Sequence, residues 1–312
     1  MKFAFPILVI LTGILLIYAM SVALNPVIHI DGLTLNGAPT EQTMGDVQRI
    51  FYYHVPSAWT AFTLFFINFI ASVQYLVRTN STTDRFVRVA MYCAAVLGIA
   101  LLFAGFVVPA LTWLAAPAAG ATLFLIAVIY MLIRFCFSHS NTDVLALVTA
   151  EVGVVFCTIV LITGPIWARP VWGIWWTWDM RLTSTLVLWL IYVSYLFLRR
   201  FSASGQTPLL AAALAVFGAL CVPFVYFSIW FFRTQHPQPV MGGGGSIDPR
   251  MLHVLLLNWL AFSCFAFLVC WSRCRLEKLQ RDVDEAHALQ SLIGETKGTE
   301  PDPSRTNPPR SA

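Results

Sequence analysis

The feature that most constrains this chain is a series of about eight apolar stretches, each about 20 residues long, which is the length of an α-helix that crosses a bilayer. Of the 312 residues, 58% are apolar and only 11% are charged. A soluble chain of this size cannot bury so much apolar surface in one core. We therefore predict an all-α, polytopic membrane helix bundle with about eight transmembrane helices, at Ala4–Leu24, Pro56–Val77, Val89–Val108, Ala118–Phe137, Val144–Ile166, Leu182–Leu198, Leu209–Ile229 and Met251–Trp271.

The distribution of Lys and Arg predicts the orientation of the bundle. Of the 19 basic residues, 14 fall on the side of the N-terminus and five on the opposite side. Basic residues concentrate in cytoplasmic loops, so both termini are expected in the cytoplasm. Residues 1–272 then form a transmembrane domain with an outer-face loop at 163–184, and residues 273–312 form a cytoplasmic tail that is partly disordered. An even number of spans separates the segments that follow spans 1, 5 and 7, so all three are expected on the outer face.

The first outer segment runs from Asn25 to Val55. Apolar and polar residues alternate around Asp31-Gly32, which predicts a hairpin with a two-residue turn. Pro56 suits the first turn of a helix and disfavours helix at Val55, so His54 is expected in a bend at the edge of the membrane. The alternative is an interfacial aromatic belt that contains a histidine by chance.

The second outer segment is rich in tryptophan. Five of the 11 tryptophans lie between positions 167 and 178, more than an ordinary interfacial belt requires. Clustered flat rings at a membrane surface suit a large, flat, apolar ligand with a polar edge. Arg169 and Arg181 can bind carboxylates on that edge, whereas Asp179 has an alternative function as the N-cap of the next helix. The predicted ligand-binding tryptophans are Trp167, Trp172, Trp175, Trp176 and Trp178.

The third outer segment contains His236 between prolines and a run of glycines at 242–245. The glycines are interpreted as a flexible tether, and Asp248-Pro249 predicts the start of the last span. Taken alone, His236 is interpreted as a solvated loop residue. Taken together, however, His54 and His236 can ligate one iron from opposite sides while the tryptophans cover a macrocycle. Imidazole binds metal only when neutral, so this ligation is expected to weaken below about pH 6.5.

Three blocks carry a resemblance to a known family. They are His-Val-Pro-Ser-Ala-Trp at 54–59, Thr-Gly-Pro-Ile-Trp-Ala-Arg-Pro-Val-Trp-Gly-Ile-Trp-Trp-Thr-Trp-Asp-Met-Arg-Leu-Thr-Ser at 163–184, and Ser-Ile-Asp-Pro at 246–249. The chain resembles the haem-handling family named for its tryptophan-rich WWD signature. Within that family it is most similar to the haem exporter C component of bacterial type I cytochrome c maturation, a subgroup whose members usually have six spans rather than eight.

The resemblance implies an outer-face site that holds haem b without a covalent bond, with His54 and His236 as axial ligands of the iron. The haem-binding residues that it implies in the WWD segment are Trp172, Trp175, Trp176, Trp178 and Asp179. It also implies that haem is delivered to a membrane-anchored chaperone, the E component, in the bacterial cytoplasmic membrane. The implied helpers are a small single-span D component and an ABC transporter formed by the A and B components. Such a protein is not expected to be an enzyme.

Two other functions remain open on the sequence. A cytochrome c synthase relative would attach haem to apocytochrome thiols, but such relatives carry further histidines inside the membrane. Here His139 falls in a cytoplasmic loop and His253 near the outer end of the last span. A transporter or quinone-binding subunit would use the tryptophans only as an anchor. Nothing in the sequence indicates nucleic-acid binding.

Polar residues within the spans are expected to have structural functions. Glu151 should face other helices or be protonated, because an ionised carboxylate is costly in lipid. Asn68, Gln74 and Asn258 are predicted to form hydrogen bonds between helices. The seven cysteines are interpreted as small apolar packing residues.

Overall fold

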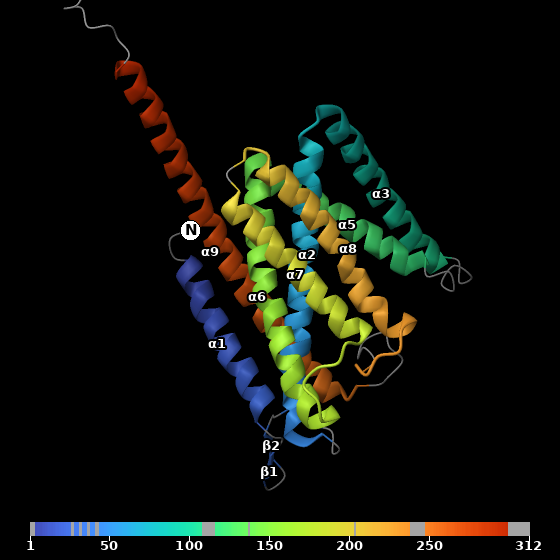
Figure 1. Ribbon diagram of the computed structural model, residues 1–312. Helices are drawn as coiled ribbons and strands as arrows, with labels where there is room; N and C mark the ends of the chain where they lie inside the picture. The colour runs from blue at the N-terminus through green and yellow to red at the C-terminus, as the bar shows by residue number, and fades with distance from the viewer. Residues whose placement is uncertain are drawn as a thin grey trace, which may run out of the picture.

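The structure is a computed structural model that describes residues 4–25, 28–30, 33–35, 38–40, 44–107, 116–136, 138–202, 204–237 and 247–298. Almost all of them are helical (Figure 1). The elements are α1 (Ala4–Leu24), β1 (Ile28–Ile30), β2 (Leu33–Leu35), the 3₁₀ helix η1 (Gly45–Ile50), α2 (Phe51–Arg78), α3 (Ser81–Val107), α5 (Ala116–Cys136), α6 (His139–Trp172), α7 (Met180–Phe201), α8 (Thr207–Phe231) and α9 (Pro249–Gly298).

Within the described ranges, 6 helices are long and apolar enough to cross a membrane, namely α1, α2, α6, α7, α8 and α9. The chain is therefore a multi-pass helical membrane protein, as the sequence predicts. The remaining two predicted spans correspond to α3 and α5, which are helical but do not belong to this group. Val108 and Phe137 lie outside the described residues. A membrane crossing by α3 and α5 stays a prediction.

The antiparallel pair α2 and α6 forms the centre of the bundle. Three contacts define the antiparallel register of the two helices: residue numbers rise along α2 while those of the contacting residues fall along α6. His54 Nδ1 lies 2.8 Å from Thr163 Oγ1, Phe65 packs at Gly153, and Asn68 donates to the Ala146 carbonyl at 2.6 Å. A Cβ atom on Gly153 would lie 2.7 Å from the Phe65 ring, so the glycine permits the close approach of the two helices.

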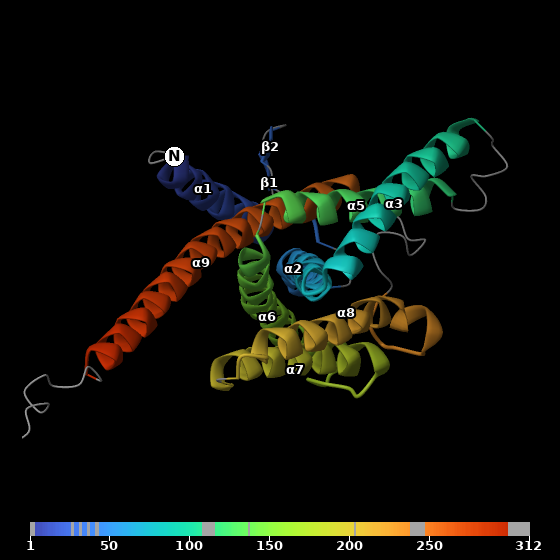
Figure 2. The ribbon, with the colours of Figure 1, turned by 90° about the horizontal axis from the view of Figure 1, so that it is seen from above.

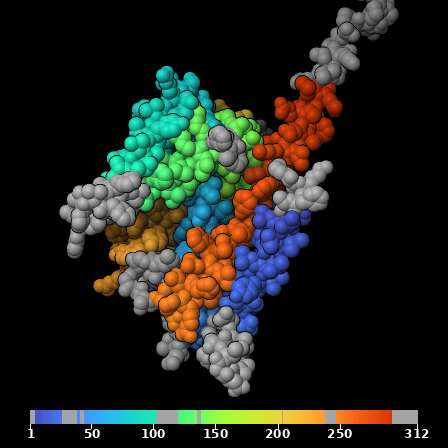
Figure 3. Space-filling view, turned by 180° about the vertical axis from the view of Figure 1, so that it is seen from behind, coloured from blue at the N-terminus to red at the C-terminus, as the bar shows by residue number. Residues whose placement is uncertain are grey.

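The other helices surround this pair. Seen from above, α7 and α8 lie together on one side of α2, while α1 and α9 lie on another (Figure 2). The opposite view shows α9 along α1, and α3 beside α5 (Figure 3). Helices α1, α6 and α8 finish at the same end of the bundle, where the β1–β2 hairpin lies and where α7 and α9 begin (Figure 1).

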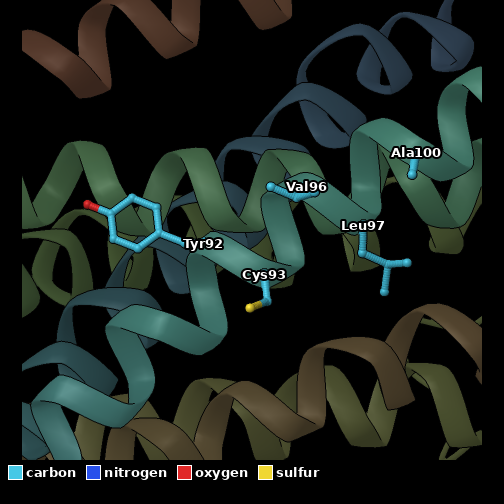
Figure 4. Close-up of a pocket in the computed structure, with 5 residues that line it drawn as sticks. All are labelled: Tyr92, Cys93, Val96, Leu97 and Ala100. Atoms are coloured by element: carbon cyan, nitrogen blue, oxygen red, sulfur yellow. The ribbon is translucent and has the colours of Figure 1, made fainter.

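The hairpin of α3 and α5 is separate from the central pair for much of its length. Its two helices approach closely at Gly98, where an added Cβ would lie 2.8 Å from the carbonyl oxygen of Gly120. An apolar hollow on α3 is lined by Tyr92, Cys93, Val96, Leu97 and Ala100 (Figure 4). It involves none of the predicted site residues.

The β1–β2 hairpin confirms the prediction made from Asp31-Gly32. Ile28 pairs with Leu35 and Ile30 with Leu33 in an antiparallel register, although Asp31 and Gly32 themselves lie outside the described residues. Arg49, in the 3₁₀ helix after the hairpin, holds the end of α1 by donating to the carbonyls of Ala23 at 3.1 Å and Asn25 at 3.0 Å.

The polar residues within the spans join helices. Glu151 forms an ion pair with Arg273 of α9 at 2.8 Å, so its charge is compensated. Gln74 donates to the Tyr130 carbonyl at 2.5 Å, and Asn258 donates to the Ala19 carbonyl at 3.3 Å. With Asn68, these contacts confirm the predicted structural functions. The predicted boundary between a membrane domain and a tail falls within α9, which continues through residues 272 and 273 without a break.

Candidate functional site

His54 lies on α2, and the prediction that it sits in a bend is wrong. Helix α2 begins at Phe51 and includes Pro56. The preceding 3₁₀ helix leads directly into it. Tyr52 donates to the Pro39 carbonyl at 2.6 Å and Tyr53 to the Met20 carbonyl at 3.1 Å. These tertiary contacts hold the first turns helical despite the local preference against helix before proline.

The structure brings His54 and His236 together. Their ring centres are 6.5 Å apart and their planes are inclined by 33°. His54 is hydrogen-bonded through Nδ1 to Thr163 Oγ1 at 2.8 Å, and His236 through Nδ1 to the Pro237 carbonyl at 2.9 Å. Burial first, and then the charge of Arg181, lower the pKa of His236 from 6.5 to about 4. This imidazole is therefore neutral, the form that binds metal, at physiological pH.

The separation of the two rings suits a single metal between them. A metal–imidazole nitrogen bond is about 2 Å long, so two imidazoles on opposite sides of one ion have ring centres about 6 Å apart. The observed 6.5 Å agrees with this arrangement. No group of three or more His, Cys, Asp or Glu residues that could hold a metal ion occurs in the described part of the chain. A porphyrin supplies four nitrogens to an iron, and two imidazoles are the number that completes six-coordination.

The tryptophan-rich segment is a loop only at residues 173–179, shorter than the loop predicted over 163–184. Helix α6 continues to Trp172 and includes Pro165 and Pro170. Proline is tolerated within membrane helices because neighbouring groups compensate for its missing hydrogen bond. Gly173 ends α6 with a φ of 79°, a left-handed conformation that glycine adopts without strain. Arg169 donates to the Gly173 carbonyl, so its guanidinium also caps the helix.

The tryptophans differ in exposure. Trp175 and Trp178 are 58% and 77% exposed, whereas Trp167, Trp172 and Trp176 are half-buried. Trp167 stands edge-on to Trp172, with ring centres 5.3 Å apart, and Trp176 stands edge-on to Trp178 at 5.8 Å.

Three buried polar atoms of this region have no hydrogen-bond partner, namely Trp176 Nε1, Thr177 Oγ1 and Thr183 Oγ1. Unsatisfied buried donors are costly and indicate a missing acceptor. A carboxylate at the edge of a bound ligand is one acceptor that these three donors fit.

Asp179 connects the tryptophan-rich loop to the His236 segment. One carboxylate oxygen accepts from the Leu182 backbone at 2.9 Å, which confirms the predicted N-cap of α7. The other oxygen accepts from Thr234 Oγ1 at 2.9 Å, and Thr234 Oγ1 in turn accepts from the His236 backbone at 3.1 Å. Asp179 therefore acts on the histidine through Thr234. Arg181, two residues after Asp179, lies near the Val225 and Tyr226 carbonyls, at 3.4 and 3.5 Å.

Sequence reasoning missed Thr163 and Thr234, the residues that hold the two histidines. Thr163 is the first residue of the tryptophan-rich block, and no local pattern marks its contact with a histidine 109 positions away. Thr234 lies two residues before His236, and a Thr-x-His spacing beside an expected ligand was the available signal. Residues 238–246, with the glycine run, lie outside the described residues.

Comparisons with known proteins agree on one family. The family model described as heme exporter protein C matches residues 110–289, which is more than half of the chain. The chain is 36% identical over 156 residues to the heme exporter protein C of Bradyrhizobium diazoefficiens, covering 49% of this chain and 59% of that protein. It is 36% identical over 132 residues to the protein of that name from Escherichia coli, covering 42% and 51%.

A third relative is aligned over a longer region. It is a mitochondrial protein of Marchantia polymorpha named as a ccmC-like protein of cytochrome c biosynthesis. The two sequences are 26% identical over 232 residues, and the alignment covers 74% of this chain and 72% of that protein. The matches to the two bacterial relatives span little more than half of their lengths. The family match includes α6, the tryptophan-rich loop, α7, the His236 segment and most of α9. The chain belongs to the heme exporter protein C family.

Proposed function

We propose that this protein binds haem at the end of the bundle where His54 and His236 meet, and that it delivers this haem for cytochrome c maturation. The two histidines are the axial ligands of the iron, and the haem is a non-covalently bound cargo. The recipient is a membrane-anchored haem chaperone, the E component, which acts with a D component and with the A and B subunits of an ABC transporter. The membrane is the bacterial cytoplasmic membrane, with the site on its outer face.

The observation that carries this proposal is the pairing of His54 with His236. The two residues are 182 positions apart in the sequence, yet their ring centres are 6.5 Å apart. This distance is close to the separation that two axial ligands require. Haem supplies the iron and four of its ligands. The chain supplies two imidazoles on separate elements, α2 and the segment after α8.

The tryptophan-rich segment supports the rest of the ligand. Trp167, Trp172, Trp175, Trp176 and Trp178 provide the aromatic surface for the macrocycle. Arg181 is the better placed of the two arginines for a propionate, since its charge already acts on His236. Arg169 keeps further donors besides the one used at Gly173. The name of the Bradyrhizobium diazoefficiens and Escherichia coli relatives, heme exporter protein C, supports haem as the ligand.

The first test is the visible spectrum of the purified protein, expressed with haem available and with the chaperone partner. We expect a Soret band and the visible bands of a six-coordinate haem. Absence of a Soret band under these conditions would rule out haem binding and leave an anchoring function for the tryptophans.

The second test removes the ligands. The double variant His54→Ala with His236→Ala is expected to lose the bound haem while its level in the membrane stays unchanged. His139→Ala is the matched control, because His139 stacks on Tyr75 with ring centres 4.5 Å apart and lies on the other end of α6. Equal loss of haem in the control would contradict the assignment of the ligands.

The third test separates delivery from haem attachment. The protein is expressed as the sole maturation factor together with an apocytochrome c. Delivery predicts that no haem becomes covalently bound to the apocytochrome. Covalent product would instead assign the chain to the synthase type.

A further inference from the structure

We infer that Thr163 is a positioning residue that fixes the tautomer of His54, so that Nδ1 carries the proton and Nε2 presents its lone pair to the iron. This inference rests on the proposed function for its ligand, but not for its geometry. Neither the family resemblance nor the relatives' names assign a function to Thr163.

The assignment follows from counting hydrogens around the threonine hydroxyl. Thr163 Oγ1 lies 2.7 Å from the Ile159 carbonyl oxygen and 3.4 Å from that of Val160. A carbonyl oxygen has no hydrogen, so the single hydroxyl hydrogen must point to Ile159. If it pointed to the imidazole instead, two oxygens would face each other at 2.7 Å with no hydrogen between them.

The bond to His54 then has only one possible direction. His54 Nδ1 lies 2.8 Å from the same Oγ1, whose hydrogen is already used. The hydroxyl therefore accepts and Nδ1–H donates. A neutral imidazole carries a single N–H, which leaves Nε2 as the free acceptor. Metal-bound histidines commonly donate their second ring N–H in this way, and that hydrogen bond fixes ring orientation and raises ligand basicity.

The second histidine is held by the same chemistry but by a different group. His236 Nδ1 lies 2.9 Å from the Pro237 carbonyl oxygen, which can only accept. Both rings therefore present Nε2, yet only one orienting partner is a side chain. The orienting partner of His54 can be removed by substitution, whereas that of His236 is backbone.

The structure also explains why the partner of His54 lies on α6. The antiparallel register of α2 and α6 places Thr163 opposite His54, as Gly153 lies opposite Phe65. A Cβ atom on Gly164 would lie 3.5 Å from His54 Cε1, so the edge of the imidazole rests against the α6 backbone. The ring is thus held by α6 at its edge and at Nδ1.

The experiment compares Thr163→Val, which removes the hydroxyl and keeps a β-branched side chain, with Thr163→Ser, which keeps the hydroxyl. Haem affinity of the full-length protein in nanodiscs is measured by titration with hemin, and the visible spectrum is recorded. We expect Thr163→Val to lose about 10–100-fold in affinity, the usual effect of removing an orienting partner, with bands shifted away from the six-coordinate form. Thr163→Ser should restore affinity and spectrum.

Two controls separate a positioning effect of Thr163 from a general structural effect. In His54→Ala protein, Thr163→Val should cause no further loss of affinity, because the hydroxyl acts only through this imidazole. Melting temperatures of Thr163→Val and wild type should agree. Unchanged affinity and spectrum in Thr163→Val, or equal losses in Thr163→Val and Thr163→Ser, would overturn the inference.

A measurement without haem keeps this inference distinguishable from the proposed function. ¹⁵N-histidine NMR of the protein without haem, with the His54 signals assigned by difference from His54→Gln, reports the tautomer directly. We expect a protonated Nδ1 in wild type and a mixture of tautomers in Thr163→Val. A protonated Nε2 in wild type would overturn the inference even if haem binds. Failure of wild type to bind hemin would overturn the proposed function alone.

Discussion

At the residue scale, the site depends on short hydrogen bonds that orient two imidazoles. His54 is oriented by Thr163 of α6. His236 is oriented by its neighbour Pro237 and by the chain from Asp179 through Thr234. The aspartate of the tryptophan-rich segment thus has both of its oxygens occupied by protein donors. We interpret it as a support for the ligand-bearing segment and not as a contact of the ligand.

The chain from Asp179 to His236 can be tested by substitution. Thr234→Val removes the hydroxyl that accepts from the His236 backbone and donates to Asp179, so the segment should loosen and haem retention should fall. Thr234→Ser is the matched control and should retain haem. Combining Thr234→Val with Asp179→Ala should cost less than the sum of the two single losses, since both break one chain. Additive losses, measured by hemin titration, would contradict this chain.

The shifted pKa of His236 predicts the pH dependence of stability. The imidazole takes up a proton near pH 6.5 in the unfolded chain but only near pH 4 in the folded protein. The unfolded state binds more protons between these values, so stability should fall as the pH drops from about 6.5 to about 4. Thermal unfolding in detergent checks this, and His236→Gln should flatten that part of the curve. An unchanged curve in the variant would contradict the shift.

At the element scale, the pairing of α2 with α6 brings the first histidine to its partner. The two helices meet closely because Gly153 leaves room for the Phe65 ring. The same feature recurs between α7 and α8, where a Cβ on Gly218 would lie 2.9 Å from the Ile191 side chain. In lipid, the hydrophobic effect does not drive helices together, so the van der Waals contacts made at such close approach contribute to their association.

A larger side chain at Gly153 should therefore disturb the site from a distance. Gly153→Leu forces Phe65 and α6 apart, at a cost of about 1–3 kcal/mol for overpacking, and should weaken the bond between His54 and Thr163. We expect a lower melting temperature and reduced haem retention. Gly13→Ala is the control, because an added Cβ there meets nothing within 4 Å. Equal retention by Gly153→Leu and Gly13→Ala would show that this register does not matter.

At the scale of the whole molecule, the bundle separates two kinds of chemistry at its two ends. His54, His236 and the tryptophan-rich segment lie at the end where α6 and α8 finish and α2 begins. Ion pairs gather at the other end, where Asp143 binds Arg199 at 2.5 Å and Arg281 at 2.9 Å. This end also holds the projecting half of α9. The arrangement agrees with a cytoplasmic end rich in basic residues.

The predicted topology is tested by labelling single cysteines in a cysteine-free background with an impermeant thiol reagent. Cysteines at the exposed positions Ile174 and Gln235 should react from the outer face, and one at Gly205 only after the membrane is permeabilised. A cysteine at Thr112, between α3 and α5, tests the eight-span prediction and should react from the outside. Labelling of Ile174 and Gln235 from opposite faces would contradict a shared site.

The sequence by itself determined which segments share an end, where several helices begin, and which residue types gather there. The apolar length of each span is a local property, and so are the capping of α7 by Asp179 and the alternation of residues that pairs β1 with β2. The tertiary structure decided that His54 lies in a helix despite Pro56, that α6 passes through Pro165 and Pro170, and that Thr163 and Thr234 hold the histidines. These outcomes depend on the register between helices far apart in the chain, and that register is set by packing at positions such as Gly153, which no local pattern encodes.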